Sequence, residues 1–350
     1  MGDLMRTLNI GIVGAGNIAQ VYGDAVLGLD SVKITGIADV ISDAGNALST
    51  KLGCPAFSSY QTMGFEANLD AVIICTPPIT HSPIAQYFAR CGVHVLCEKP
   101  LSIDVPSAKS MLRCAAENGI ILTMASKFRF VDDMISARNL IASGNLGEIV
   151  QIENTFTSYV DMSQRWNAIR TFSGGGVLID NGTHASDIFR FLMGPLLQVH
   201  AVEAKRVQRL QVEDTASFTV RAASGALGTS DLSWSLQKPT DSFIRIYGTG
   251  GTLFVGWKDS RLLARGSSDW DTVGRGYDKL GAFKGQIENF VRAIRGEEQI
   301  EVTPTEALAS VEAIDAVYAS IRFNRWAFVR AAGPGDAFGN ERRTPLLQSA

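Results

Sequence analysis

Short apolar runs alternate with amphipathic stretches through the first third of the chain. Apolar runs bounded by glycine or polar residues indicate buried strands, and apolar spacings of three and four indicate helices between them. The pattern predicts strands near 8–14, 32–38, 70–75, 93–97 and 120–125, and helices near 17–28, 43–52, 81–91 and 104–118. Strands that alternate with helices build a parallel sheet with crossover helices. We therefore predict a doubly wound α/β domain over residues 1–126.

From about residue 127 the apolar positions follow a period of two. This part predicts strands near 149–159, 197–207, 213–223, 226–236, 242–248 and 251–256, with helices near 131–143, 181–193, 285–295 and 305–323. We expect a large, mostly antiparallel sheet with helices on one face, in an α+β domain over residues 127–330. An uncovered sheet face is typical of a subunit interface, so we expect a homodimer or homotetramer through this sheet. Residues 331–350 are expected to form a peripheral tail.

A glycine-containing turn follows the first predicted strand. Gly14 permits a tight turn, and Gly16 lets a pyrophosphate approach the backbone closely. A helix beginning at Asn17 and Ile18 would direct unpaired N–H groups and a partial positive charge at those phosphates. The turn predicts a dinucleotide-binding site, although the glycines alone would also fit a plain tight turn.

The second predicted strand ends at Asp39. An acidic residue at this distance from the glycines accepts hydrogen bonds from the adenosine ribose hydroxyls. Val40 and Ile41 follow, so no adjacent cation would neutralise a 2′-phosphate, which the carboxylate would repel. We expect NAD rather than NADP as the cofactor. The alternative for Asp39 is a turn residue or a cap of the next helix.

Further polar groups follow later strands of the predicted parallel sheet, whose ligands bind at the carboxyl ends of the strands. The predicted cofactor contacts at this rim are Thr76, Pro77, His81, Glu98 and Lys99. An ammonium group at Lys99, beside a substrate oxygen, would stabilise a developing alkoxide. The alternatives are a solvated lysine in a proline turn and, for His81, a helix-capping histidine.

A second group of candidate catalytic residues lies in the stretch from Gly174 to Asp187. Asp180 and His184 are four residues apart near the start of a predicted helix, so both can face the same space. An imidazole with a pKa of about 6.5 can accept the proton of a substrate hydroxyl. His184 is therefore the predicted base, with a surface histidine as the alternative. Asp180 would orient His184, bind a substrate hydroxyl or cap the helix.

The composition of the chain argues against nucleic acid and membranes as binding partners. The net charge of −3 offers no basic surface for nucleic acid or an anionic membrane. The five cysteines show no C-x-x-C spacing, which favours a reducing cytoplasm, and no apolar run approaches the roughly 20 residues of a membrane span. We expect a soluble cytoplasmic protein with no metal site and a small-molecule substrate.

Taken together, these segments resemble the glucose–fructose oxidoreductase, inositol dehydrogenase and MocA-type (Gfo/Idh/MocA) family of nicotinamide-dependent oxidoreductases. The resemblance extends to about residue 330 and rests on the segments 14–19, 76–81, 92–100, 174–187 and 285–290. It implies a Rossmann domain, a second domain with a large, mostly antiparallel sheet, a tightly held NAD(H) or NADP(H), and polyol, sugar or nucleotide-sugar substrates. By motif match, the catalytic lysine, aspartate and histidine of the family correspond to Lys99, Asp180 and His184.

One segment departs from the family pattern. Many relatives carry an arginine pair and a proline after the fifth strand, where this chain has Lys127-Phe128-Arg129-Phe130. Aromatic faces and planar donors suit sugar rings and their hydroxyls. The candidate substrate contacts are Lys127, Arg129, Tyr159, Trp166, Asn167 and Arg170, together with Asp180 and His184.

The sequence therefore predicts an NAD-dependent dehydrogenase that reversibly oxidises a ring hydroxyl of a cyclitol, sugar or sugar derivative to a ketone. A dehydrogenase or reductase for nucleotide-linked sugars is one alternative, favoured if Arg129 or Arg170 contacts a diphosphate. A non-catalytic NAD-binding sensor is the other.

Overall fold

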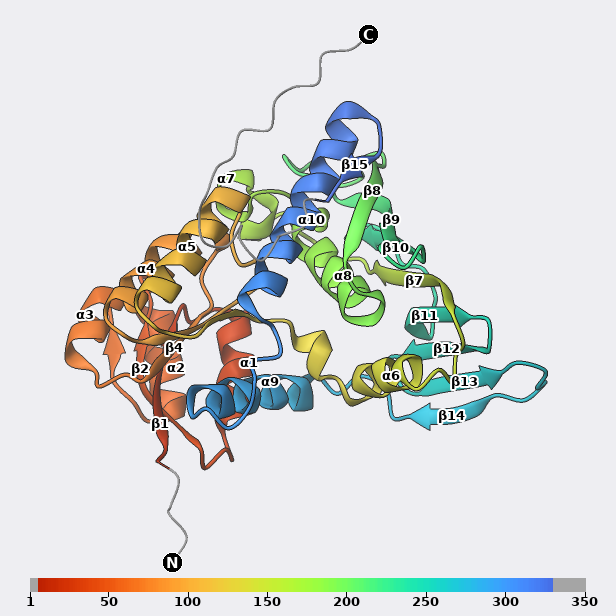
Figure 1. The fold of residues 1–350 in the computed structure, drawn as a ribbon. Helices are drawn as coiled ribbons and strands as arrows, with labels where there is room; N and C mark the ends of the chain where they lie inside the picture. Colours follow the sequence, from red (N-terminus) through yellow and green to blue (C-terminus); the bar gives the residue numbers. More distant parts are fainter. Residues whose placement is uncertain (1–5, 330–350) are drawn as a thin grey trace, which may run out of the picture.

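The computed structural model describes residues 6–329, so the predicted tail lies outside the described residues. The chain forms two sheets with helices packed around and between them (Figure 1). Within residues 6–329, none of the helices combines the length and the apolar character needed to cross a membrane.

The first sheet has six parallel strands in the order β3-β2-β1-β4-β5-β6. The strands are β1 (Leu8–Val13), β2 (Val32–Ala38), β3 (Ala56–Phe57), β4 (Ala71–Ile74), β5 (His94–Cys97) and β6 (Leu122–Met124). Helices α1 (Asn17–Val26), α2 (Ser42–Leu52), α3 (Tyr60–Glu66), α4 (His81–Arg90) and α5 (Val105–Glu117) connect them. The predicted doubly wound Rossmann fold is confirmed, while the short β3 and α3 were not predicted.

Strand order reverses at β1, which pairs with β2 on one side and β4 on the other. In such a sheet the ligand binds outside the carboxyl ends of the strands at this reversal. The strands are buried on both faces, with Ile10, Ile12 and Ile73 fully excluded from solvent. Burial of this kind explains why the strands are continuous apolar runs.

The second sheet has nine strands in the order β14-β13-β12-β11-β7-β10-β9-β8-β15. The strands are β7 (Ile149–Thr157), β8 (Leu196–Glu203), β9 (Thr215–Ala222), β10 (Leu227–Ser233), β11 (Ser242–Gly248), β12 (Gly251–Gly256), β13 (Ser260–Ala264), β14 (Asp271–Gly274) and β15 (Ala327–Phe328). β7 and β10 run parallel and the other neighbours antiparallel, which confirms the predicted, mostly antiparallel sheet. β13, β14 and β15 were not predicted.

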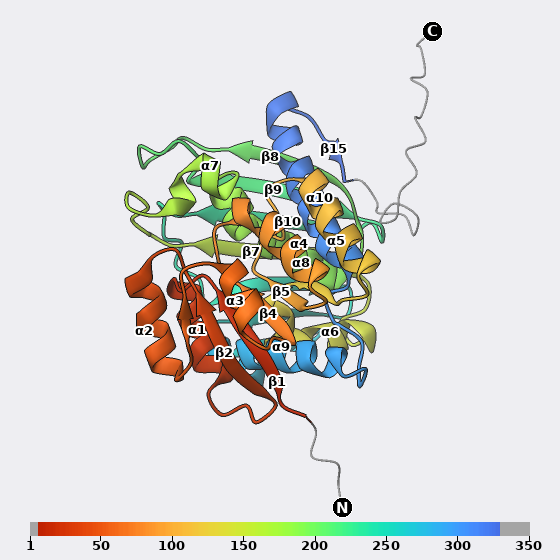
Figure 2. The same cartoon turned by 90° about the vertical axis from the view of Figure 1, so that its left-hand side faces the viewer.

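Helices cover the face of the second sheet that is turned toward the first domain (Figure 1). They are α6 (Asp132–Ala142), α8 (Val177–Met193) and α10 (Pro304–Phe323), and the short α7 (Arg170–Ser173) precedes α8. In Figure 2, α10 also runs beside α5 of the Rossmann domain, with which it is in contact. Helix α10 therefore packs against both domains.

Helix α9 (Lys279–Ile294) lies late in the chain but packs with the first sheet. Its residues Phe283, Ile287 and Phe290 are buried in one cluster with Ile10 and Tyr22 of β1 and α1. The sequence-based division at residue 126 placed this helix in the second domain. The difference arises because the apolar face of α9 does not indicate which sheet it covers.

Candidate active site

The glycine turn between β1 and α1 is shaped to receive a phosphate group. Gly14 has φ of +92°, and a Cβ atom there would lie 2.9 Å from the backbone carbonyl group of Cys75. At Gly16 a Cβ would meet only open space, and no side chain caps the start of α1. The first N–H groups of α1 can therefore bind the pyrophosphate of a dinucleotide.

Asp39, at the end of β2, holds this turn in place. Its carboxylate accepts hydrogen bonds from the backbone N–H of Ala15 at 2.6 Å and of Ile41 at 2.7 Å. The side chains of Val40 and Ile41 are exposed and uncharged. This edge of the site suits a ribose with free hydroxyls better than one with a 2′-phosphate.

A cleft of about 360 Å³ extends from the glycine turn to the end of β5. Of the predicted cofactor contacts, it is lined by Gly16, Asn17, Ile18, Thr76, Glu98 and Lys99. Gly14, Asp39 and Pro77 do not line it. The cleft also includes Trp166 and Asn167, two of the candidate substrate contacts, so the structure brings these two to the cofactor side.

The structure corrects the assignment of His81 as a cofactor contact. Its side chain is fully buried, and its ring nitrogens lie 2.9 Å from the carbonyl oxygen of Pro100 and 2.8 Å from that of Thr76. His81 therefore connects the loops that follow β4 and β5 and does not line the cleft. The peptide bond between Lys99 and Pro100 in this region is cis.

Glu98 anchors the end of β5 to two helices. Its carboxylate accepts hydrogen bonds from the Tyr22 hydroxyl at 2.9 Å and from the backbone N–H of Lys99 at 3.1 Å, and Gln286 of α9 donates to Tyr22. Burial raises the pKa of Glu98, while the charges of Lys99 and Lys127 act against this rise. These contacts fix the backbone from which the Lys99 side chain projects.

Lys99 reaches from the Rossmann domain to helix α8. Its amine forms an ion pair with the Asp180 carboxylate and lies 3.2 Å from the Asp180 carbonyl oxygen. Asp180 was expected to orient His184, to bind a substrate hydroxyl or to cap the helix, and in the structure its carboxylate pairs with the Lys99 amine. Both side chains remain partly exposed, at 16% and 24%, so solvent and substrate can reach the pair.

His184 lies one helical turn beyond Asp180 on α8. Its ring packs edge-on against Phe128, with centroids 5.1 Å apart, and more distantly against Phe156. Burial, together with the positive charges of Lys99 and Lys127, holds the pKa of His184 well below its ordinary value of 6.5. The imidazole is therefore neutral at neutral pH and can accept a proton.

Lys99, Asp180 and His184 line one cavity of about 560 Å³ at the end of β5. Its apolar walls are Phe128, Phe156, Trp257 and Phe283, and its other polar groups include Lys127, Thr157, Ser158 and Asn181. Apart from Lys127, sequence reasoning missed these residues. Thr157 and Ser158 lie at the end of the strand predicted near 149–159, and their position at a strand end is a signal that could have found them. Phe283 carries no such signal, because it belongs to a helix that folds back from far along the chain.

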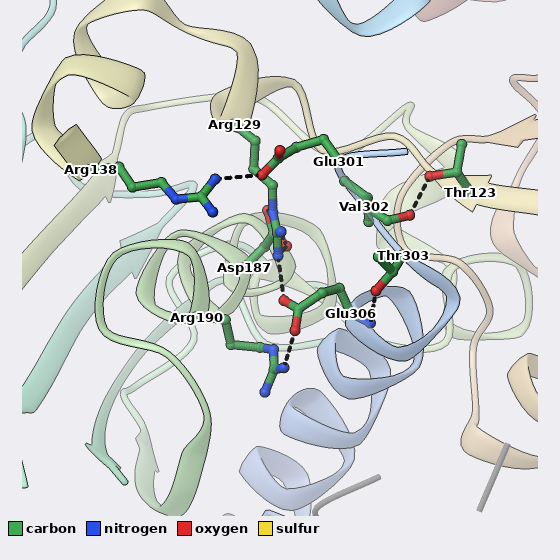
Figure 3. Close-up of polar contacts among 9 residues, drawn as sticks. All are labelled: Thr123, Arg129, Arg138, Asp187, Arg190, Glu301, Val302, Thr303 and Glu306. Atoms are coloured by element: carbon green, nitrogen blue, oxygen red, sulfur yellow. Dashed lines mark hydrogen bonds and ion pairs between the residues drawn. The ribbon is translucent and has the colours of Figure 1, made fainter. Parts of the chain in front are cut away.

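Arg129 was predicted to contact substrate, but the structure places it in a buried ion-pair network (Figure 3). It follows Lys127 in the 3₁₀ helix η2 (Lys127–Phe130), and its guanidinium binds Asp187 of α8 through two nitrogens and Glu306 of α10 through one. Arg190 binds the second oxygen of Glu306 at 2.6 Å. The network ties η2, α8 and α10 together, and so fixes the helix that carries Asp180 and His184.

Two further candidates stay outside both cavities. Tyr159 is 68% exposed, and Arg170 is also exposed at the start of α7. Neither lines the cofactor cleft or the cavity around His184. In the described part of the chain, no group of three or more His, Cys, Asp or Glu side chains is placed to hold a metal ion.

Sequence models of one protein family match both domains. Residues 8–126 match the family described as "Oxidoreductase family, NAD-binding Rossmann fold", and residues 134–254 match the "GFO/IDH/MocA C-terminal domain". Inositol 2-dehydrogenase of Rhizobium meliloti (strain 1021) is 26% identical over 329 residues, which cover 91% of this chain and 98% of that protein. The rhizopine catabolism protein MocA of Rhizobium meliloti is 26% identical over 324 residues, or 89% of this chain and 94% of the relative.

Solved structures share the whole fold. Levoglucosan dehydrogenase in complex with NADH superimposes with a TM-score of 0.87 at 20% identity, covering 93% of this chain and 100% of that chain. An oxidoreductase from Agrobacterium radiobacter, in complex with NAD+, L-tartaric acid and magnesium, gives a TM-score of 0.85 at 19% identity, covering 93% and 99%. Since the family models span both domains, the chain belongs to the Gfo/Idh/MocA family of NAD-binding oxidoreductases.

Proposed function

We propose that this protein oxidises a ring hydroxyl of a cyclitol, sugar or sugar derivative to a ketone, reversibly and with NAD as hydride acceptor. One observation carries the proposal. Lys99 from the Rossmann domain, and Asp180 and His184 from α8, line a single cavity at the end of β5. The cofactor cleft shares Ile18, Lys99 and Asp180 with this cavity, so a dinucleotide in the cleft would end beside the three side chains.

Each residue has a role that its surroundings support. His184, neutral because its pKa is lowered, takes the proton of the substrate hydroxyl. The ammonium of Lys99 stabilises the negative charge that develops on the substrate oxygen. Asp180 holds that ammonium in position. Bound NAD supplies the hydride acceptor. In the reverse direction the protonated His184 returns its proton to the oxygen.

The choice of NAD over NADP rests on the end of β2. Asp39 would repel a 2′-phosphate, and the uncharged side chains of Val40 and Ile41 offer nothing to neutralise it. The alternative of a nucleotide-linked sugar required a diphosphate contact from Arg129 or Arg170. Arg129 forms ion pairs with Asp187 and Glu306, and Arg170 lines neither cavity. Neither arginine therefore favours a nucleotide-linked sugar as the substrate.

The test is to mix purified protein with NAD or NADP and a panel of inositols, free sugars and nucleotide sugars, and to follow the absorbance of NADH or NADPH. We expect turnover with a member of the first two groups and faster turnover with NAD. The matched control is Lys99→Met, which should lower kcat by about 10² to 10⁴-fold while NADH still binds. Absence of turnover with every member, or unchanged turnover in the variant, would refute the proposal.

A further inference from the structure

Lys127 places a second amine in the cavity around His184, and none of the described residues forms an ion pair with it. Its Nζ lies 5.2 Å from the ring centroid of Phe128, 5.7 Å from Tyr277 and 5.8 Å from Phe283. Ring faces at these distances favour the charged form of the amine. Among residues 6–329, Lys127 has neither a hydrogen bond nor an ion pair with a side chain or the backbone.

The carboxylates near Lys127 are already engaged. Asp180 pairs with Lys99, and the two oxygens of Glu98 accept hydrogen bonds from Tyr22 and from the backbone of Lys99. The cations Lys99 and Lys279 also act on Lys127. Four charged side chains line the cavity, the amines of Lys99 and Lys127 and the carboxylates of Glu98 and Asp180. Lys99 and Asp180 form an ion pair, whereas the charges of Glu98 and Asp180 act on the Lys127 amine without a direct contact.

That ammonium keeps its charge at neutral pH. Burial is the main cause that lowers the pKa of Lys127 to about 8, and the charge of Lys99 adds to it. The group therefore remains mostly protonated at pH 7. A partly buried ammonium without a hydrogen-bond acceptor among residues 6–329 has lost hydration that the nearby rings and charges replace only in part. A negatively charged group on the bound substrate would supply the missing partner.

We propose that Lys127 forms the carboxylate-binding end of the substrate cavity, so that the preferred substrate is a cyclitol or sugar that carries a carboxylate, such as a uronate. This inference rests on the proposed function and narrows its substrate class. A phosphate is less suited, because phosphate sites usually combine several donors with an arginine or a helix N-terminus. The Lys127 amine instead lies over the rings of Phe128, Tyr277 and Phe283.

The positions of Lys127 and His184 agree with a substrate of this size. Phe128 contacts both, with its centroid 5.2 Å from the Lys127 amine and 5.1 Å from the centroid of the His184 ring. A substrate that spans the face between them would place its carboxylate at Lys127 and a ring hydroxyl at His184. The aromatic side chains of Phe156 and Trp257 line the same cavity and suit the apolar face of such a ring.

The test compares acids with matched neutral sugars, for example galacturonate with galactose and glucuronate with glucose. Binding to the NADH complex is measured by calorimetry, and turnover with NAD by NADH formation. In the wild-type protein we expect at least one acid to bind at least tenfold more tightly than its neutral counterpart. In Lys127→Met this preference should fall at least tenfold, mainly through KM in the turnover assay. In the wild-type protein the preference for the acid should also weaken as the pH rises past the Lys127 pKa of about 8, because the amine then loses its charge.

Lys279→Met is the matched control, since Lys279 is an exposed cation near Lys127 and lines neither cavity. It should keep the acid preference. The inference is overturned if no acid binds more tightly than its neutral counterpart, or if Lys127→Met preserves the preference. Acids that bind through Lys127 without any turnover would instead refute the proposed oxidation and leave the carboxylate site standing.

Discussion

His184 owes its suitability as a base to its surroundings. An imidazole in water is half protonated near pH 6.5, so many of its copies would be unable to accept a proton in mildly acidic solution. Here burial against Phe128 and Phe156, and the charges of Lys99 and Lys127, lower the pKa of His184. The imidazole of His184, the proposed base, therefore stays unprotonated well into the acidic range.

The pH dependence of catalysis follows from this lowered pKa. Since the base works unprotonated, kcat/KM for a neutral substrate should rise with pH below about 6.5 and be level at neutral pH. His184→Asn should lose this acidic limb together with about 10² to 10⁴-fold of the rate. Lys127→Met removes one of the charges that lower the pKa of His184. In this variant the rise of kcat/KM with pH should therefore occur at higher pH.

Steady-state kinetics between about pH 4 and 9 would measure how kcat/KM of each variant depends on pH. This range extends about two units to either side of the ordinary histidine pKa. Lys279→Met, with its exposed cation, serves as the control whose limb should stay in place. A wild-type limb centred above pH 7, or one that persists in His184→Asn, would contradict the assignment of His184 as the base.

The identities of the central residues could be predicted from sequence, but their contacts could not. Lys99 follows a predicted strand, and Asp180 and His184 share a helical spacing, so both groups point to one rim. The partner of Asp180 depends on how the two domains meet, and it proved to be Lys99. The same limit applies to Arg129, whose partners come from two distant helices.

At the scale of elements, helix α8 is held at its start and near its middle. At its start, Glu213 accepts hydrogen bonds from the backbone N–H groups of Gly176 at 2.9 Å and Leu178 at 3.2 Å. Further along, Asp187 pairs with Arg129. The sequence predicted a start near residue 181, whereas the helix begins at Val177. The three consecutive glycines at 174–176 indicate a break in the helix. The Glu213 carboxylate that binds the first N–H groups lies far away in the sequence, so no local pattern indicates the earlier start.

The Arg129 network predicts a large effect on stability. The side chains of Arg129 and Asp187 are each only 4% exposed, so Arg129→Met leaves Asp187 buried without its partner. The free energy of unfolding should fall by about 3 to 5 kcal/mol. Urea unfolding measures this change.

Arg138→Met is the matched control, because Arg138 and its partner Glu301 are 51% and 32% exposed. Its loss should stay below about 1 kcal/mol. Adding Asp187→Leu to Arg129→Met removes the stranded charge and should restore part of the stability. A loss below about 1 kcal/mol in Arg129→Met would show that the network does not hold α8 in place.

The whole molecule leaves one face of the nine-stranded sheet without a helix over it among the described residues (Figure 1). Thr219 and Thr229 pair across its central strands, and both are half-buried. Along β10, Thr229 lies between Leu227, which is exposed, and Asp231, which is half-buried. The face therefore combines polar and apolar groups, as subunit interfaces do.

We expect this face to join subunits into a dimer or tetramer. Native mass spectrometry at micromolar concentration should detect the oligomer, and Thr229→Lys should shift it toward monomer because an ammonium would be buried at the interface. Thr229→Ser, which keeps the hydroxyl, should leave the assembly intact. A wild-type protein that is only monomeric would contradict this expectation.

The overall architecture was accessible from the sequence because the period of apolar positions changes from one domain to the next. The edge strands β13 and β14 escaped prediction, since their exposed residues from 260 to 274 show little alternation. Helix α9 was predicted as an element but assigned to the wrong sheet. Because α9 packs against α1, its residue Phe283 lines the cavity. No local sequence pattern indicates this long-range packing.

The central claim is that Lys99 and His184, from different domains, act together on one hydroxyl beside the nicotinamide. A crystal structure of the complex with NADH and a bound sugar or cyclitol tests it most directly. We predict that the hydroxyl oxygen lies within hydrogen-bond distance of both side chains, with its carbon about 3 to 3.5 Å from the hydride-carrying carbon. A nicotinamide bound elsewhere, or either side chain turned to bulk solvent in every subunit, would contradict the claim.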